Sequence, residues 1–271
     1  MFRIHKPALP LSRYVESLWY ASTSGMAPSR QRVYPDGAMA LVIHLEKPTA
    51  TYFVGEETRS IGVPLLAGPW SQSFQIDPSL STGVVGVVFR PGAARMFFPV
   101  AAHELHNIDI PLQELYPSEA DRLLNEVCSA AGEEARLRVV EEYLRQRLMR
   151  AAPIPPAVNY AVRQLSSAGG VRRVRAIQRE TGLSHTRFIQ LFREHVGLTP
   201  KLFCRVRRFR ALLNRMEKGE PVSWAELAAD CGYFDQAHMI RDFRAFAGAT
   251  PGEFSRLPEA ASRSSASPAS S

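Results

Sequence analysis

The chain has 271 residues, 45% of them hydrophobic, and a formal net charge of +7. This length suits one large or two ordinary domains, and the apolar content is enough for real hydrophobic cores. Three cysteines without regular spacing, Cys128, Cys204 and Cys231, argue against a disulfide framework or a zinc cluster and indicate reduced thiols.

Targeting and membrane signals are not found in the sequence. Residues 1–20 contain no continuous apolar core followed by a small-residue cleavage site, so we do not expect secretion. No apolar run approaches the ~20 residues that a membrane span needs. We therefore expect a soluble, cytoplasmic protein without a membrane partner.

Charge is distributed unevenly along the chain. Residues 1–152 hold 15 Lys/Arg and 16 Asp/Glu, a net charge of −1, whereas residues 153–271 hold 18 and 10, a net charge of +8. A neutral half joined to a basic half indicates that only the second half meets a polyanion. Charge alone leaves open a basic half that is merely soluble.

Short apolar runs separated by glycine and proline characterise the first half. They are residues 39–45 (MALVIHL), 50–55, 73–76 and 83–89 (GVVGVVF). Short β-branched runs at this close spacing predict antiparallel strands in a barrel or sandwich.

A helical pattern at 133–149 follows these strands. It places Leu137, Val140, Leu144 and Leu148 on one face of a helix. This face packs either on the sheet of its own domain or, as a dimerisation helix, against a second copy of the chain.

Two segments mark the domain boundaries. Residues 151–158 (AAPIPPAV) contain three prolines and coincide with the change in charge, which is typical of a linker. Residues 258–271 are rich in Ser, Ala and Pro, a composition typical of disorder. We predict a domain over 1–150, a linker over 151–158, a second domain over 159–257 and a disordered tail over 258–271.

Helix start and stop signals run through the second domain. Ser184 and Asp235 are candidate N-caps of two helices. Gly197 and Gly248 stand where these two helices are expected to end.

A long helix lies between these two helices. Thr199 and Pro200 start it, and residues 223–226 (SWAE) form a capping box for the next one. Its expected inner stripe is Leu202, Val206, Phe209, Leu213 and Met216.

One short element occurs twice in this domain. With an offset of 51, residues 183–203 align with 234–254, and seven of the 21 positions are identical. The identical pairs are Ile189/Ile240, Phe192/Phe243, Arg193/Arg244, Gly197/Gly248, Thr199/Thr250, Pro200/Pro251 and Phe203/Phe254. These residues set geometry, so the chain repeats one scaffold with two different exposed faces.

Each copy has the order helix, tight glycine-containing turn, helix, which is the helix-turn-helix pattern. Its second helix can lie in a major groove of DNA. Phe188 and Phe192 face inward in the first copy, and Met239 and Phe243 in the second, because residues four apart share a helix face. A generic helical pair can show the same inward aromatic residues. The doubled motif and the charge together favour DNA binding.

The opposite helix faces carry the candidate DNA contacts. Candidate base-reading residues are His185, Thr186, Ile189, Gln190, Gln236, Ala237, His238 and Arg241. Gln can pair with adenine, Arg with guanine, and Thr, Ala or Ile can meet a thymine methyl group. Arg187, Arg193 and Arg244 are better placed for phosphates, which position the protein without specifying sequence.

Residues 157–256 resemble the DNA-binding domain of the AraC/XylS family of bacterial transcription regulators. The residues that carry this resemblance are 225–254, AELAADCGYFDQAHMIRDFRAFAGATPGEF. The resemblance implies two helix-turn-helix subdomains joined by a long helix, with both recognition helices in successive major grooves. The first copy departs in one place: Gln178 stands where the family usually has a small Ala, whereas Ala228 keeps the family type.

The first half is similar to the N-terminal domain of a subset of these regulators. Residues 33–45 (VYPDGAMALVIHL) and 84–98 carry this second resemblance. Family members commonly have a cupin-like β-barrel here that binds an effector or dimerises. The expected fold is therefore α+β with two domains: an N-terminal β-barrel with flanking helices, and an all-α domain with two helix-turn-helix subdomains.

Enzymatic and metal sites are not expected. His103 and His106 are three residues apart and His44 lies on an expected strand, but a metal site needs three or four converging ligands. The sequence has no nucleophile elbow, phosphate-binding loop or dinucleotide motif. Trp19, Trp70 and Phe53 are candidates for lining a ligand pocket or simply for the core. We expect no catalysis, cofactor or metal.

The sequence therefore predicts a sequence-specific regulator that binds double-stranded DNA and responds to a small-molecule effector in its N-terminal domain. The alternative is a regulator whose N-terminal domain only dimerises or binds a protein partner. Further partners under these readings are a second copy of the chain and, for an activator, RNA polymerase.

Overall fold

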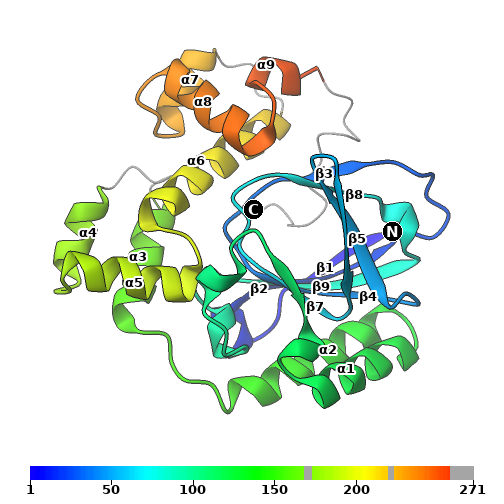
Figure 1. The fold of residues 1–271 in the computed structure, drawn as a ribbon. Helices are drawn as coiled ribbons and strands as arrows, with labels where there is room; N and C mark the ends of the chain where they lie inside the picture. The colour runs from blue at the N-terminus through cyan, green and yellow to red at the C-terminus, as the bar shows by residue number, and fades with distance from the viewer. Residues whose placement is uncertain (168–172, 219–222, 257–271) are drawn as a thin grey trace.

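The computed structural model describes residues 1–167, 173–218 and 223–256, which form a β-rich N-terminal domain and a helical C-terminal domain (Figure 1). The expected two-domain α+β organisation is confirmed. The tail predicted to be disordered, 258–271, lies outside the described residues.

Two antiparallel sheets build the N-terminal domain. One has the strand order β1-β2-β9-β4-β7-β10 and the other β3-β8-β5-β6. The strands are β1 (Phe2–His5), β2 (Val15–Ser22), β3 (Gln31–Val33), β4 (Ala40–His44), β5 (Thr49–Val54), β6 (Glu57–Gly62), β7 (Leu65–Ala67), β8 (Phe74–Ile76), β9 (Gly83–Phe89) and β10 (Asp109–Pro111). The four apolar runs predicted as strands correspond to β4, β5, β8 and β9.

Strand β9 lies at the centre of the larger sheet, between β2 and β4, and all of its residues are buried. Successive strand residues point to opposite faces. Val85, Val87 and Phe89 therefore join the main core, whereas Val84 and Val88 pack with Trp19 on the other face. Gly86 shares that second face, and a Cβ atom there would overlap the Trp19 indole.

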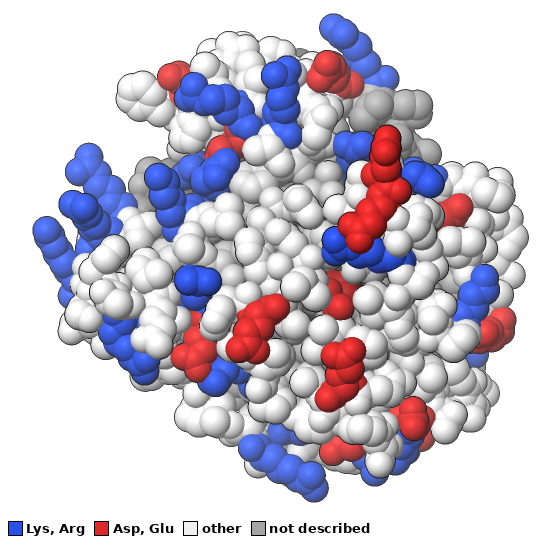
Figure 2. Space-filling view, in the orientation of Figure 1, with Lys and Arg blue, Asp and Glu red and all other residues white. Residues whose placement is uncertain are grey.

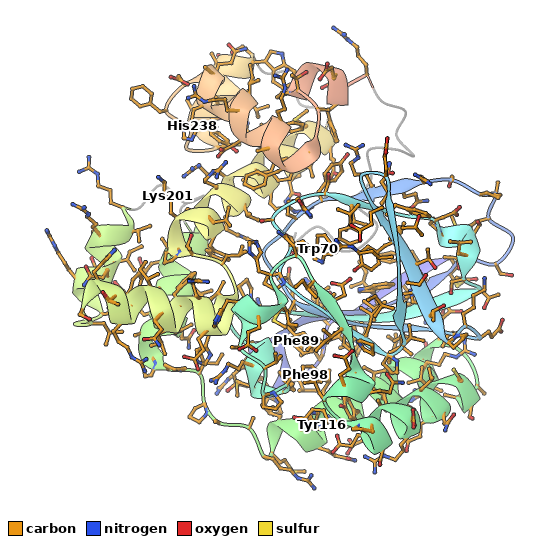
Figure 3. All side chains as sticks on the ribbon, in the orientation of Figure 1. Trp70, Phe89, Phe98, Tyr116, Lys201 and His238 are labelled. Carbon is orange, nitrogen blue, oxygen red and sulfur yellow. The ribbon has the colours of Figure 1, made fainter. Side chains whose placement is uncertain are left out.

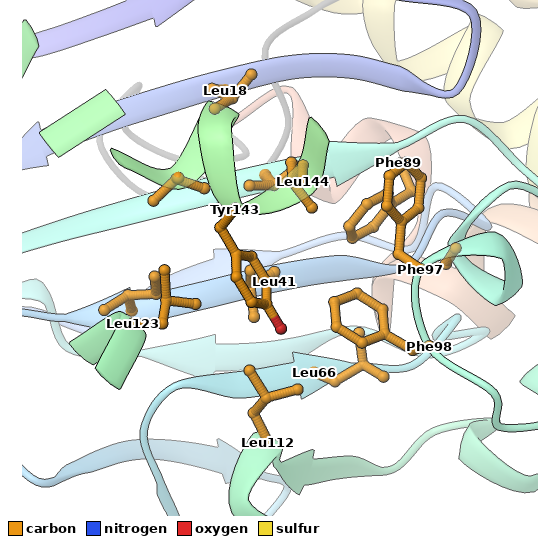
Figure 4. Packing of buried hydrophobic residues seen from close by; sticks show 14 of the residues in the cluster. Leu18, Leu41, Leu66, Phe89, Phe97, Phe98, Leu112, Leu123, Tyr143 and Leu144 are labelled. Carbon is orange, nitrogen blue, oxygen red and sulfur yellow. The ribbon is translucent and has the colours of Figure 1, made fainter. Parts of the chain in front are cut away.

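Two helices cover the main-core face of this sheet, α1 (Pro117–Ser129) and α2 (Glu133–Leu148) (Figure 1). Leu137, Val140 and Leu144 of α2 are buried in the same cluster as Leu41 and Phe98 (Figure 4). The apolar stripe predicted for this helix is thus used inside its own domain. Burying a side chain of this size contributes about 1.5–3 kcal/mol.

The C-terminal domain consists of helices only, within the ranges that the structure describes. They are α3 (Pro156–Ser167), α4 (Val174–Glu180), α5 (His185–Val196), α6 (Pro200–Glu217), α7 (Trp224–Asp230), α8 (Gln236–Ala247) and α9 (Pro251–Phe254). Figure 1 shows α6 running from α5 at one end to α7, α8 and α9 at the other. In its predicted inner stripe, Val206, Phe209 and Leu213 are fully buried, while Leu202 and Met216 pack against that core.

Local signals fix where these helices begin. The Ser184 hydroxyl accepts a 3.3 Å hydrogen bond from the Arg187 amide, and the Asp235 carboxylate accepts one of 2.6 Å from the His238 amide. Thr199 caps α6 in the same way, and Ser223 and Glu226 form the predicted capping box. Such a cap contributes about 1 kcal/mol, which matters for short helices.

Glycines end both second helices of the repeat. Gly197 follows α5 with φ 87° and Gly248 follows α8 with φ 71°. Only glycine adopts this left-handed conformation without steric cost, so the two stop signals read from the sequence are confirmed.

Candidate DNA-binding surface and ligand cavity

The first helix-turn-helix consists of α4 and α5. Phe188 and Phe192 of α5 are buried, as predicted from their spacing. Of the candidate contacts, His185, Thr186, Arg187 and Gln190 are exposed. The remaining base-reading candidate of this helix, Ile189, is half-buried and packs against the domain core.

Gln178 occupies the position where a small residue was expected in α4. Its side-chain amide donates a hydrogen bond to the carbonyl oxygen of Leu183, in the turn between the helices. The Thr181 hydroxyl donates to the Gln178 carbonyl at 2.6 Å. The longer side chain is therefore accommodated by bonding to the turn, so this turn gains a hydrogen bond that an Ala cannot supply.

A groove of about 370 Å³ runs along the outer face of α5. It is lined by His103, His185, Thr186, Ile189, Gln190 and Arg193. His103 belongs to a short 3-10 helix, Ala102–Leu105, of the N-terminal domain. Four base-reading candidates and one phosphate candidate thus share one surface, beside a histidine from the other domain.

The second helix-turn-helix consists of α7 and α8. Met239 and Phe243 are fully buried, again as predicted. Gln236, Ala237 and Arg241 are exposed on α8, and so is the phosphate candidate Arg244.

His238 is half-buried, in contrast to the neighbouring candidates on α8. Its ring meets the Tyr233 ring edge-on at 5.3 Å, and its Nε2 lies 3.8 Å from a carboxylate oxygen of Asp242 (Figure 3). Tyr233 and Asp242 therefore fix the position of the imidazole, whose exposed part lies on the outer face of the helix.

Asp242, a buried residue behind the outer face of α8, was not among the sequence candidates. It is 3% exposed on α8 and accepts a 2.9 Å hydrogen bond from Nε of Arg205 on α6. Arg208, also on α6, lies 3.8 Å away. A buried carboxylate needs partners of this kind. The only hint of Asp242 in the sequence was that a charged residue stands at the position that Leu191 occupies in the first copy of the repeat.

Basic side chains gather on the helical domain. Figure 2 shows Lys and Arg over α4 and α5 and around α6 to α8, whereas acidic residues are interspersed over the rest of the visible face. Arg173, Arg175 and Arg179, at and within α4, are exposed and were not among the sequence candidates. Clustered cations are the electrostatic signal of nucleic-acid binding.

A cavity of about 810 Å³ lies between the two sheets of the N-terminal domain. Its walls are mostly apolar and include Trp19 and Trp70, both candidates from the sequence. The third candidate, Phe53, lies outside the wall and stacks under the Arg30 guanidinium at 4.0 Å. Predominantly apolar walls at this volume are typical of small-molecule sites.

Asp109 and His44 are among the ionisable residues that line the cavity, and burial shifts the pKa of both. Burial raises the pKa of Asp109 to about 6, although hydrogen bonds from the Trp70 indole (2.9 Å) and the Gly68 amide oppose the shift. Burial lowers the pKa of His44 to about 4. At neutral pH the cavity therefore holds a neutral imidazole and a carboxylate that remains close to its titration range.

The histidines considered as metal candidates from the sequence lie in different surroundings. His106 Nε2 lies 2.7 Å from the Ser71 hydroxyl, and His103 faces α5. Across the described residues, no three His, Cys, Asp or Glu side chains come together as metal ligands do.

Among the helices that the structure describes, none is long and apolar enough to cross a membrane.

Comparisons with known proteins agree with the two-part organisation. Residues 177–257 match the family model described as a helix-turn-helix domain, and residues 3–111 match a domain of unknown function, DUF6597. No curated protein matches the sequence.

Solved structures of ToxT from Vibrio cholerae are similar to this chain. ToxT of strain O395 is 10% identical with a TM-score of 0.43, over 84% of this chain and 96% of that one. ToxT of strain SCE256 with a bound unsaturated fatty acid is 13% identical with a TM-score of 0.43, over 94% of each chain. Together with the doubled helix-turn-helix, the two family matches identify an AraC-type helix-turn-helix domain over residues 177–257, joined to an N-terminal domain of the DUF6597 family.

Proposed function

We propose that this regulator reads a specific DNA sequence with α5 and α8 and responds to a small molecule in the cavity of its N-terminal domain. The observation that carries the first part is the repeated recognition helix. Each copy is fixed by a side-chain N-cap and a left-handed glycine, buries its aromatic face and exposes polar residues on the other.

Base reading is assigned to the exposed faces of the two helices. Arg241 can donate two hydrogen bonds to guanine, and Gln190 and Gln236 can pair with adenine. Thr186, Ala237 and the exposed part of Ile189 can meet thymine methyl groups, and His185 and His238 can donate to base acceptors.

Phosphate contacts are assigned to arginines at the edges of these faces. Arg187, Arg193 and Arg244 come from the recognition helices, and the exposed Arg173, Arg175 and Arg179 extend the same surface across α4. Such contacts supply affinity and register, and they make binding dependent on salt.

The cavity supports the second part of the proposal. Its volume of about 810 Å³ suits a small organic molecule, and its aromatic and aliphatic walls suit one with an apolar body. Arg210 and Glu217 of α6 also line it, so an occupant would touch the DNA-binding domain directly.

Selection of bound fragments from random DNA tests the DNA-binding part. We expect one enriched sequence motif, with two blocks read by the two recognition helices. The full chain should bind this motif about a thousandfold more tightly than random DNA at the same salt concentration. Equal affinity for both would contradict sequence-specific recognition.

Thermal-shift screening of the full chain against a metabolite library tests the effector part. A true cavity ligand should raise the melting temperature of the wild type, because binding to the folded state stabilises it. The variant A38L, which adds bulk to the cavity wall, should lose that shift. Ligands that stabilise both proteins equally bind elsewhere.

A second candidate role for the N-terminal domain is protein binding or dimerisation. The observation in its favour is β1, the edge strand of the larger sheet, whose Phe2 and Ile4 are 51% and 45% exposed. Exposed apolar edge strands pair with other chains. A stable dimer in sedimentation, together with no ligand in the thermal screen, would favour this role.

A further inference from the structure

The two glycines that end the recognition helices are equivalent in the repeat, and both contact the N-terminal domain. A Cβ atom at Gly197 would overlap the Pro69 ring and stand 2.8 Å from the Ala102 carbonyl oxygen. A Cβ atom at Gly248 would stand 3.1 Å from the Arg32 guanidinium. The same domain therefore closely approaches the C-terminal end of each recognition helix.

Polar contacts hold both ends in place. The Arg32 guanidinium donates a hydrogen bond to the carbonyl oxygen of Ala247, the last residue of α8. A cation at this end also interacts favourably with the helix dipole. Beside the end of α5, Arg95 forms a 2.7 Å ion pair with Glu194.

Tyr34 carries the contact with the second helix-turn-helix into the core. This residue of the N-terminal domain is 3% exposed and belongs to the hydrophobic core of the C-terminal domain. Its ring meets Phe254 of α9 edge-on at 5.7 Å and lies 6.2 Å from the Phe209 ring of α6. A buried aromatic pair in this geometry stabilises the contact beyond the area that it buries.

The neighbouring residue Gly37 makes a third close approach. It has φ 75°, and a Cβ atom there would stand 3.4 Å from the Phe203 ring and 3.5 Å from Leu198. Arg32 thus contacts α8, Tyr34 contacts α6 and α9, and Gly37 lies against the start of α6.

The segments that make these contacts also form walls of the cavity. The lining residues within 31–39 are Gln31, Val33, Tyr34, Pro35, Asp36, Ala38 and Met39, and those within 67–70 are Ala67, Gly68 and Trp70. We name these two segments, 31–39 and 67–70, the clamp. An occupant of the cavity would contact the clamp on one side, and the ends of the recognition helices contact the clamp on the other side.

We propose that the clamp couples the cavity to the DNA-binding domain: occupancy of the cavity sets the placement of the two recognition helices relative to each other, with Tyr34 as the main positioning residue. This inference rests on the proposed function for its consequence in DNA binding. The mechanical contact itself can be tested without DNA or ligand.

Hydrogen exchange of the full chain, followed by mass spectrometry, tests the contact. Y34A should speed exchange of the α8 and α9 amides by about tenfold or more, because it removes a ring from their core. Y34F keeps the ring and should exchange like the wild type. Y143A removes a buried tyrosine between α2 and its sheet, so it should affect α1 and α2 and leave α8 unchanged. Unchanged exchange of α8 and α9 in Y34A would overturn the proposal.

A substitution inside the cavity tests the coupling. A38L adds bulk beside Trp19, with which Ala38 packs. It should change exchange of the α8 amides by about threefold or more in the wild type and have no effect in the Y34A background, because coupled residues give non-additive effects. No effect in the wild type, or the same effect in both backgrounds, would contradict coupling through Tyr34.

DNA spacing tests the consequence. Into the selected site, one or two base pairs are inserted between the blocks read by α5 and α8. The wild type should lose affinity by about tenfold or more, and Y34A by less than about threefold, while both keep discrimination within each block. An equal loss for both proteins would show that α6 alone sets the spacing. If neither protein prefers any sequence, the proposed function fails, and the exchange experiment still decides on the clamp.

Discussion

At the scale of single residues, the outer face of α8 separates two kinds of arginine. Arg241 projects from the middle of the recognition helix, and Arg244 lies one turn further along, near its end. Both are exposed, so their substitution should leave the fold intact and change only DNA binding.

We expect R241A to lose about 1–3 kcal/mol of binding free energy and to relax discrimination at one base pair. R244A should instead weaken binding to all sequences alike and reduce the slope of log affinity against log salt by about one. Fluorescence anisotropy with single-base variants of the selected site measures both effects. A uniform loss in R241A would reassign that residue to phosphate.

Asp109 in the cavity wall makes a testable contribution to the pH dependence of stability. Its pKa of about 6 in the folded protein lies above the ordinary 3.8, so the protonated form favours folding. That contribution is fully present below pH 3.8 and is lost as the pH rises through 6. Relative to the wild type, D109N should therefore gain stability between pH 4 and pH 7, on the order of 2–3 kcal/mol.

Urea unfolding of both proteins across this pH range measures the difference. D121N, at an exposed position of α1, is the control for the loss of one negative charge. If D109N and the wild type change in parallel with pH, the carboxylate is not held out of water as the structure places it.

At the scale of elements, the attachment of α8 to α6 depends on the buried carboxylate of Asp242. D242N keeps the shape but weakens the bonds to Arg205 and Arg208, and we expect it to cost about 1–3 kcal/mol of unfolding free energy. Asp230 pairs with Arg215 at 2.6 Å but is half-exposed, so D230N should cost less than about 1 kcal/mol. Thermal unfolding of the two variants compares them, and equal costs would argue against a special role for Asp242.

Elements with local start and stop signals were predicted well from the sequence. Ser184, Asp235 and Gly197 act within a few residues of their own position, so the bounds of α5 and α8 could be predicted. Asp242 could not be recognised, because its need for partners is evident only when α6 lies beside it. The Arg32 hydrogen bond to Ala247 spans 215 residues, and nothing near either residue indicates it.

The role of the 133–149 helix shows a second kind of limit. Its apolar stripe is equally suited to a sheet or to a second copy of the chain, because both offer an apolar surface. The structure assigns the stripe to the domain's own core. Tyr34 shows the converse: it directly follows strand β3 of the N-terminal domain, yet its core partners lie in the other domain.

At the scale of the whole molecule, the division of charge determines how binding responds to salt. The net charge of +8 lies in residues 153–271, and phosphate contacts are assigned to six arginines of that half. Affinity for the selected site should fall by about a thousandfold or more between 50 and 200 mM salt, if six phosphates are neutralised. Titrations at several salt concentrations give the slope of log affinity against log salt concentration. A slope of magnitude near one would show that most of these arginines do not contact phosphates.

The position of Trp19 across Gly86 gives this protein its own optical probe. The chain has three tryptophans: Trp19 and Trp70 line the cavity, and Trp224 begins α7 in the second helix-turn-helix. A molecule that enters the cavity would change the surroundings of two indoles and so alter their emission, without any label. Substituting Trp224 would leave a protein whose fluorescence reports from the cavity wall alone, so filling of the cavity could be followed in real time while DNA is bound.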